Sequence, residues 1–166
     1  MTGTPESGPR RSRRLLLVVA AGLLAVALIV DPIARHTLAG GRSIDLGVLQ
    51  LRLTYNTGVA FSMGNQLPTP VLLTVTGLVT AAVVVYAWRA APTSTWPTIV
   101  GLAAIVAGAA ANVIDRTLDG RVTDYLHTGW FPTFNLADTF LTCGVALLLV
   151  SLFTEARTES TKETAR

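Results

Sequence analysis

The sequence predicts an all-α membrane protein, in which a bundle of four transmembrane helices carries a small extracytoplasmic β-rich element. Of the 166 residues, 51% are hydrophobic and only 14% are charged, whereas soluble domains carry about 25% charged residues. The apolar residues also form long blocks separated by short polar segments. The net charge of +3 is modest and much of it lies in one N-terminal cluster, so nucleic acid is not expected as a partner.

The first predicted span lies close to the N-terminus. Residues 1–14 are polar and end in a cluster of four arginines, which predicts a disordered cytoplasmic tail. The apolar run 15–30 follows and, with some flanking residues, reaches the roughly 20 residues that cross the hydrocarbon layer. A cleaved signal peptide is the alternative, but no A-x-A cleavage site follows closely. We expect an uncleaved span that ends near Asp31, and we expect Asp31 to pair with Arg35 one turn on.

The region at 35–67 contains alternating apolar positions, such as Ile44 and Leu46. A period of two is typical of short β-strands. Because a strand edge cannot face lipid, this piece is expected at the membrane surface, packed on the protein. The sequences at 56–58 and 64–68 are typical of turns.

Three further apolar runs predict the remaining spans. They are residues 71–88, residues 98–114, and a run from about Asn135 to about Phe153. A polar loop at 115–134 precedes the last span, and a charged tail at 154–166 follows it. The N-terminal arginines and Arg89 place both termini in the cytoplasm, although arginines on the other face obey the positive-inside rule only in part.

The unusual polar residues near the spans all fall on the predicted outer side. They are Asp31, Asn56, Asn112, Asp115, Arg116, Asp124, Asn135 and Asp138. Ionisable side chains at membrane depth are costly and often functional. Their convergence on one end of the bundle is the main functional signal in the sequence.

Two aspartates on this side suggest a reaction. Asp138 opens the last apolar run, where Asn135 is a good N-cap and a carboxylate three residues on resembles a capping box, so a structural role is open. Asp124 lies between apolar Val122 and aromatic Tyr125, although an ordinary loop aspartate is also open. If the two meet at the mouth of the bundle, they share a proton. One can then activate a water and the other can protonate a leaving amine, which is peptide hydrolysis without a metal.

Other chemistry has less support in the sequence. His36 and His127 have no evident third ligand and no HExxH pattern occurs, so neither a metal nor another cofactor is expected. Asn112 and Arg116 either bind a substrate backbone or tie the end of the third span together, and both interpretations stay open. A non-enzymatic bundle, such as a transporter subunit, is the rival function. It would need polar groups near the middle of several spans, where this chain has few.

Three blocks of sequence, in this order between the four spans, resemble the lipoprotein signal peptidases (signal peptidase II). They are YNTGVAFS at 55–62, ANVIDRTLDGRVTDYLH at 111–127 and FNLADTF at 134–140. The similarity covers the chain from about Asp31 to about Phe153. The chain departs from the family pattern at Ala111, where glycine is usual, and at Arg35, which stands in place of a lysine.

The resemblance implies a membrane-embedded aspartic endopeptidase, formed by a four-span domain at 15–153. Its implied substrates are bacterial prolipoproteins that carry a diacylglyceryl group, cleaved just before the lipidated cysteine. The implied catalytic dyad is Asp124 and Asp138, and the implied substrate-binding residues are Asn56, Asn112, Arg116 and Asn135. The implied partners are the lipid-modified substrate and membrane lipid. We expect a monomer in the bacterial inner membrane, with no cofactor and with both termini in the cytoplasm.

Overall fold

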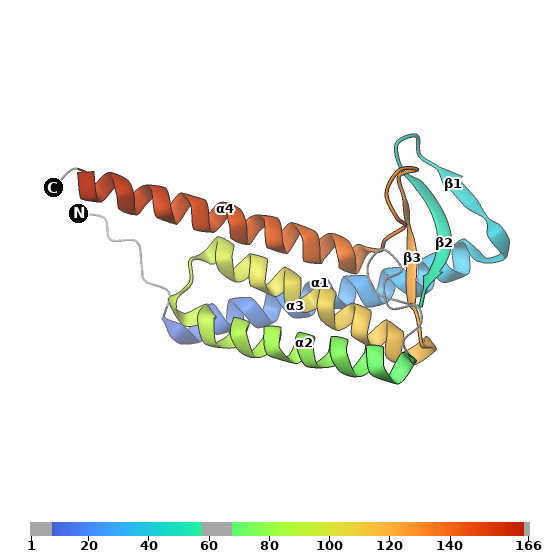
Figure 1. The fold of residues 1–166 in the computed structure, drawn as a ribbon, viewed down its shortest axis with the longest axis horizontal. Helices are drawn as coiled ribbons and strands as arrows, with labels where there is room; N and C mark the ends of the chain where they lie inside the picture. The colour runs from blue at the N-terminus through green and yellow to red at the C-terminus, as the bar shows by residue number, and fades with distance from the viewer. Residues whose placement is uncertain (1–7, 58–67, 165–166) are drawn as a thin grey trace.

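Four long helices run side by side, and a small antiparallel sheet covers one end of the bundle (Figure 1). The computed structural model describes residues 8–57 and 68–164. The helices are α1 (Pro9–Thr37), α2 (Thr69–Ala90), α3 (Trp96–Asp119) and α4 (Leu136–Thr164), with short 3-10 turns η1 (Ala39–Gly41) and η3 (Ala91–Thr93). The strands are β1 (Ser43–Asp45), β2 (Gln50–Asn56) and β3 (Val122–His127). All four helices are long and apolar enough to cross a membrane, so the predicted fold class is confirmed.

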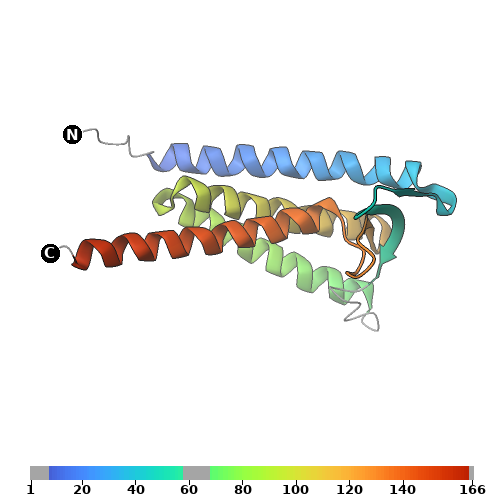
Figure 2. The same cartoon turned by 90° about the horizontal axis from the view of Figure 1, so that it is seen from above.

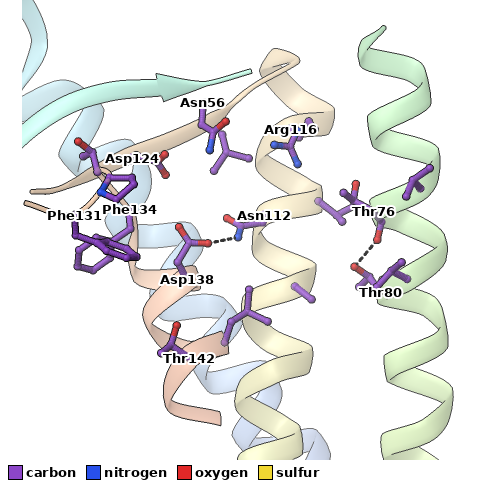
Figure 3. Close-up of a pocket in the computed structure, with 18 residues that line it drawn as sticks. Asn56, Thr76, Thr80, Asn112, Arg116, Asp124, Phe131, Phe134, Asp138 and Thr142 are labelled. Carbon is purple, nitrogen blue, oxygen red and sulfur yellow. Dashed lines mark hydrogen bonds between the residues drawn. The ribbon is translucent and has the colours of Figure 1, made fainter. Parts of the chain in front are cut away.

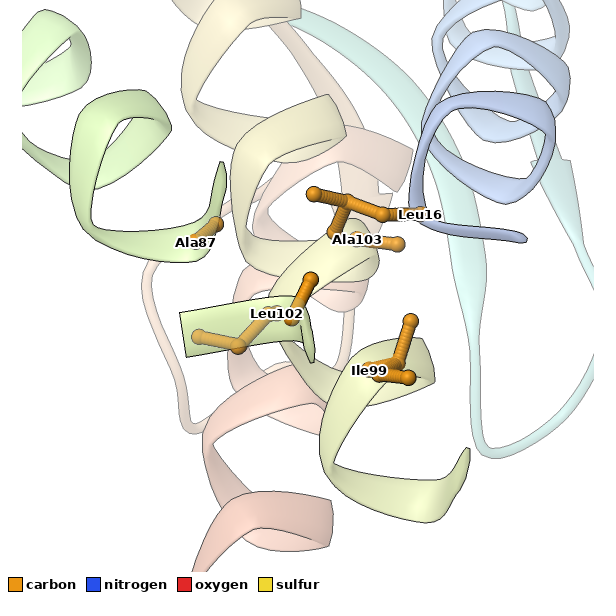
Figure 4. Close-up of a cluster of buried hydrophobic side chains, with 6 residues drawn as sticks. Leu16, Ala87, Ile99, Leu102 and Ala103 are labelled. Atoms are coloured by element: carbon orange, nitrogen blue, oxygen red, sulfur yellow. The ribbon is translucent and has the colours of Figure 1, made fainter. Parts of the chain in front are cut away.

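The two ends of the bundle differ in character. The start of α1, the turn between α2 and α3, and the end of α4 all lie at the end away from the sheet (Figure 2). At that end α1, α2 and α3 close around a buried apolar cluster that includes Leu16, Ala87, Ile99, Leu102 and Ala103 (Figure 4). The polar residues that the sequence singled out gather at the opposite end, beneath the sheet.

Helix α3 is the most buried of the four and packs closely against α4. Its small residues permit this approach, as the sequence predicted. A Cβ atom added at Gly108 would clash with the carbonyl oxygen of Ala137, and one added at Gly144 would lie 2.7 Å from that of Gly101. The first turn of α4, which contains Asp138, therefore rests directly on the backbone of α3.

The sheet has the order β1-β2-β3, and all its pairs are antiparallel. Strands β1 and β2 confirm that the alternating apolar positions within 35–67 form short β-strands. In the β2–β3 pair, Thr54 lies opposite Asp124. Strand β3 falls within the segment predicted as a polar loop, so that prediction is wrong there. Its first four residues are all buried, and a strand that is buried on both faces lacks the period-two pattern by which strands are recognised.

All four helices extend beyond the predicted spans, and α3 continues to Asp119, into the segment predicted as a polar loop. α1 begins at Pro9, within the segment expected to be a disordered tail, and it continues past Asp31 to Thr37; α4 likewise continues into the expected tail, to Thr164. An apolar run reports the thickness of hydrocarbon, whereas a helix can continue into water beyond it. Gly58, Ala60, Phe61 and Ser62 of the first sequence block, and nearly all of the turn predicted at 64–68, lie outside the described residues.

Candidate active site

Asp124 and Asp138 come from different elements and meet at the sheet end of the bundle. Asp124 lies in the middle of β3 and is only 3% exposed, while Asp138 lies in the first turn of α4. Both side chains line the same cavity, and Figure 3 shows them on one side of it, facing α3. The two carboxylates that the sequence selected are thus neighbours in space although 13 residues separate them in the chain by their numbering.

A pair of asparagine side chains links the two carboxylates. The Nδ2 of Asn135 donates hydrogen bonds to Asp124 Oδ1 at 3.2 Å and to Asn112 Oδ1 at 3.0 Å. The Nδ2 of Asn112 in turn donates to Asp138 Oδ1 at 2.8 Å. Each amide keeps a fixed orientation, because flipping either one would place its oxygen, an acceptor, against another acceptor oxygen. Asn112 and Asn135 therefore hold the carboxylates in a defined relation.

The start of α4 is a reciprocal cap. The backbone N–H of Asp138 donates to Asn135 Oδ1 at 2.9 Å, and the backbone N–H of Asn135 donates to Asp138 Oδ2 at 3.2 Å. This is the capping box that the sequence indicated. The cap leaves Asp138 Oδ1 directed at Asn112, so the capping role fixes the carboxylate in place without removing it from the cavity.

Burial perturbs the acidity of Asp124. Desolvation, reinforced by the negative charge of Asp138, raises the pKa of Asp124 to about 7, and side-chain hydrogen bonds from Asn56 and Asn135 oppose the change. A carboxyl group with this pKa is close to half protonated at neutral pH. A proton is therefore available to the pair under conditions in which an ordinary aspartate would have lost it.

The remaining residues selected from the sequence border the same cavity, which has a volume of about 510 Å³. Asn56 reaches it from the end of β2, and the buried side chain of Arg116 lies one turn beyond Asn112 on α3 (Figure 3). Arg116 is within electrostatic reach of both aspartates. Thr76 and Thr80 of α2 and Phe131 of the loop before α4 also line it, and the sequence had not selected these. Polar groups thus cluster at the sheet end, while mainly apolar walls continue between α2, α3 and α4.

Comparison with known proteins decides the family. The sequence profile described as signal peptidase (SPase) II matches residues 15–154. The chain belongs to the signal peptidase II family. Similar relatives include the lipoprotein signal peptidase of Rhodococcus jostii (strain RHA1), which is 35% identical over 88% of this chain and 76% of the relative. That of Mycobacterium avium (strain 104) is 34% identical over 88% of this chain and 82% of the relative.

Two solved structures of membrane enzymes have a similar fold. One, described as a bacterial membrane enzyme at 2.3 Å resolution, is 25% identical with a TM-score of 0.74, and covers 85% of this chain and 88% of its own. A second, at 1.9 Å resolution, is 26% identical with a TM-score of 0.69 and covers 82% and 91%. As a signal peptidase II, the chain is a multi-pass membrane protease of the aspartic type that removes signal peptides from prolipoproteins.

The structure of this signal peptidase II also contains contacts that the sequence did not predict. Asp31 is not paired with Arg35. It accepts a hydrogen bond of 3.0 Å from the hydroxyl of Tyr125. That hydroxyl in turn accepts one of 3.2 Å from the backbone N–H of Leu136. Arg35 instead contacts Asp115 of α3. The predicted pair relied on helical spacing, which shows which side chains are neighbours on one helix but not which helix packs against them.

Proposed function

We propose that Asp124 and Asp138 are the catalytic dyad of this signal peptidase II. The observation that carries the proposal is that one amide bridge, through Asn135 and Asn112, joins both carboxylates at the edge of a single cavity. The raised pKa of Asp124 supports it, because an aspartic protease needs one carboxyl group protonated while the other is ionised.

The reaction on this proposal requires no covalent intermediate. The ionised carboxylate removes a proton from a water molecule, and the oxygen of that water attacks the carbonyl carbon of the scissile peptide. The protonated carboxyl group donates a hydrogen bond to the carbonyl oxygen as negative charge develops there. Transfer of a proton to the peptide nitrogen then allows the C–N bond to break. The products are a new carboxyl terminus on the signal peptide and a free amine on the lipoprotein.

Four further residues fit substrate binding. We assign this role to Asn56, Asn112, Arg116 and Asn135, whose side chains surround the dyad. The guanidinium of Arg116 is suited to carbonyl oxygens of an extended substrate backbone, since it has several fixed donors and no acceptor. The apolar walls between α2, α3 and α4 are suited to a side chain or an acyl chain that enters from the bilayer. We propose on this basis that cleavage occurs before a cysteine that carries diacylglycerol, with membrane lipid as the second partner.

The proposed setting is the bacterial inner membrane. The arginines near the start of α1, together with Arg89 at the end of α2, favour a cytoplasmic location for that end of the bundle. Both termini would then be cytoplasmic, and the sheet and dyad would face outward. The chain supplies both aspartates and all four proposed binding residues itself, so we propose that a monomer is sufficient for activity.

The dyad can be tested by cleavage of a lipidated precursor in proteoliposomes. We expect Asp124→Asn and Asp138→Asn each to lower kcat at least about a thousandfold, because the uncharged amide can neither accept nor donate the catalytic proton. Asp45→Asn is the matched control, since Asp45 is exposed on β1 and should be dispensable. Efficient cleavage by either dyad variant, when it is inserted in the membrane as well as the wild type, would refute the assignment.

A further inference from the structure

Near the end of α1, Arg35 forms ion pairs with two carboxylates of α3, and we call Arg35, Asp115 and Asp119 the clamp. In Arg35, Nη2 contacts Asp115 Oδ1 and Nη1 contacts Asp119 Oδ2, so each arm of the guanidinium holds a different carboxylate. These partners lie one turn apart on α3 but in different surroundings. The Asp115 side chain is 3% exposed, whereas that of Asp119 is 40% exposed.

Only one arm of the clamp continues toward the dyad. The second oxygen of Asp115, Oδ2, accepts a hydrogen bond of 2.6 Å from the backbone N–H of Thr123. Thr123 is buried in β3 and is bonded directly to Asp124 along the chain. The Asp115 carboxylate therefore joins the guanidinium of Arg35 to the peptide unit between Val122 and Thr123, one residue before the proposed catalytic Asp124.

The position of this peptide unit matters because it joins β3 directly to α3, in addition to the pairing of β3 with β2 and the bond from Asn135 to Asp124. The clamp and the Thr123 contact fix β3 against the helix that also provides Asn112, which bonds Asp138. A misplacement of reacting groups by about 1 Å can lower a rate about a hundredfold. Loss of Arg35 would also remove the ion pair of the buried Asp115 carboxylate and leave Arg116 as a nearby cation, which favours rearrangement because burying a poorly paired charge is costly.

We propose that Arg35 is a positioning residue of this protease, which acts through Asp115 and the backbone of Thr123 to hold Asp124 in line with Asp138. The inference rests on the proposed dyad and adds to it a residue that does not touch the substrate cavity. Asp119 has no role in this positioning; it braces the outer arm of the guanidinium at the surface.

The two carboxylates of the clamp provide a matched pair of variants. In proteoliposomes with a lipidated precursor, we expect Asp115→Asn to lower kcat about tenfold or more while KM stays within about twofold, because the cavity lining is intact. Asp119→Asn, on the same helix and with the same arginine as partner, should leave both constants within about twofold. Equal losses in the two variants, or no loss in either, would overturn the positioning role.

Changes at Arg35 itself test whether it acts through Asp115. Arg35→Met should lower kcat about tenfold or more, whereas Arg35→Lys, whose ammonium can still reach Asp115, should stay within about threefold of the wild type. In the double variant Arg35→Met with Asp115→Asn, we expect no further loss beyond the worse single variant, since both remove one connection. If the losses in kcat of the two single variants multiply in the double variant, Arg35 and Asp115 act independently and the proposed connection is wrong. If Arg35→Met does not insert, the Asp115 and Asp119 pair still decides the outcome.

The dyad and the clamp can fail separately. If Asp124→Asn retains activity, the dyad is wrong. If Asp124→Asn is inactive but Asp115→Asn behaves like Asp119→Asn, only the role given to Arg35 is wrong.

Discussion

Asp124 combines burial with an ionisable group, and this combination has an effect on stability. Its pKa is raised to about 7 from an ordinary value of 3.8, first by desolvation and then by the charge of Asp138. The folded protein therefore holds this proton more tightly than the unfolded chain does. It follows that the contribution of Asp124 to folding stability is most favourable below about pH 4 and is lost as the pH rises to about 7.

The predicted loss of stability with rising pH can be tested by replacing Asp124 with an uncharged residue. Asp124→Asn removes the titration but keeps a similar shape, so its Tm in detergent should rise relative to the wild type as the pH increases from about 5 to about 8. A constant difference for Asp124→Asn would mean that the carboxyl group is not perturbed in the folded protein.

Local residue chemistry was predicted correctly at the start of α4 but not at Asp31, where the expected pair with Arg35, four residues on, is replaced by contacts to other elements. The capping box of Asn135 and Asp138 could be predicted because its members are three residues apart and the pattern has a physical cause. The bond from Tyr125 to Asp31 could not, because it joins residues 94 positions apart. Burial and the nearby charge of Asp31 raise the pKa of Tyr125, so its hydroxyl keeps its proton and remains a donor.

At the scale of elements, the approach of α3 and α4 determines where Asp138 sits. Gly108 faces the backbone of α4 at Ala137, directly before Asp138. The sequence predicted close packing from the small residues of the third span, since small side chains allow helix backbones to approach. It could not predict that one glycine lies beside the first turn of α4, because that depends on how far the two helices are shifted along each other.

The contact at Gly108 leads to a testable difference between two glycines. We expect Gly108→Ala to destabilise the protein by about 1–3 kcal/mol and to lower kcat, since the added methyl group must push the start of α4 away. Gly77→Ala on α2 is the control, because an added Cβ there meets no atom of the described residues within 4 Å and alanine favours helix. Thermal unfolding and precursor cleavage measure both effects. Similar behaviour of the two variants would show that the α3–α4 contact is looser than described.

At the scale of the whole molecule, the sequence predicted four spans and the β-rich element, because hydrophobic blocks and period-two alternation are visible in one dimension. It did not predict β3 as a strand, since its first residues are buried on both faces. The domain limits at 15–153 remain a prediction. Helical structure at residues 9–14 and up to Thr164 shows that α1 and α4 project beyond the apolar runs.

The proposed orientation can be tested with single cysteines in a Cys143→Ala background. A membrane-impermeant thiol reagent applied to spheroplasts should label Asp45→Cys, which lies at the sheet end of the molecule. Thr93→Cys lies in the turn between α2 and α3, at the opposite end, and should be labelled only after the membrane is permeabilised. The reverse pattern would place the dyad on the cytoplasmic side and would contradict the orientation.

The position of Asp138 at the start of the last helix has a consequence for biosynthesis. A ribosome completes α1, α2, α3 and β3 before it reaches this residue. If Asp124 and Asp138 are the dyad, a partly translated chain has Asp124 but still lacks Asp138. It also lacks α4, whose first turn holds the Asp138 end of the bridge through Asn135 and Asn112. The nascent protease therefore cannot cleave a lipidated precursor until the start of α4 has been made and has packed against α3.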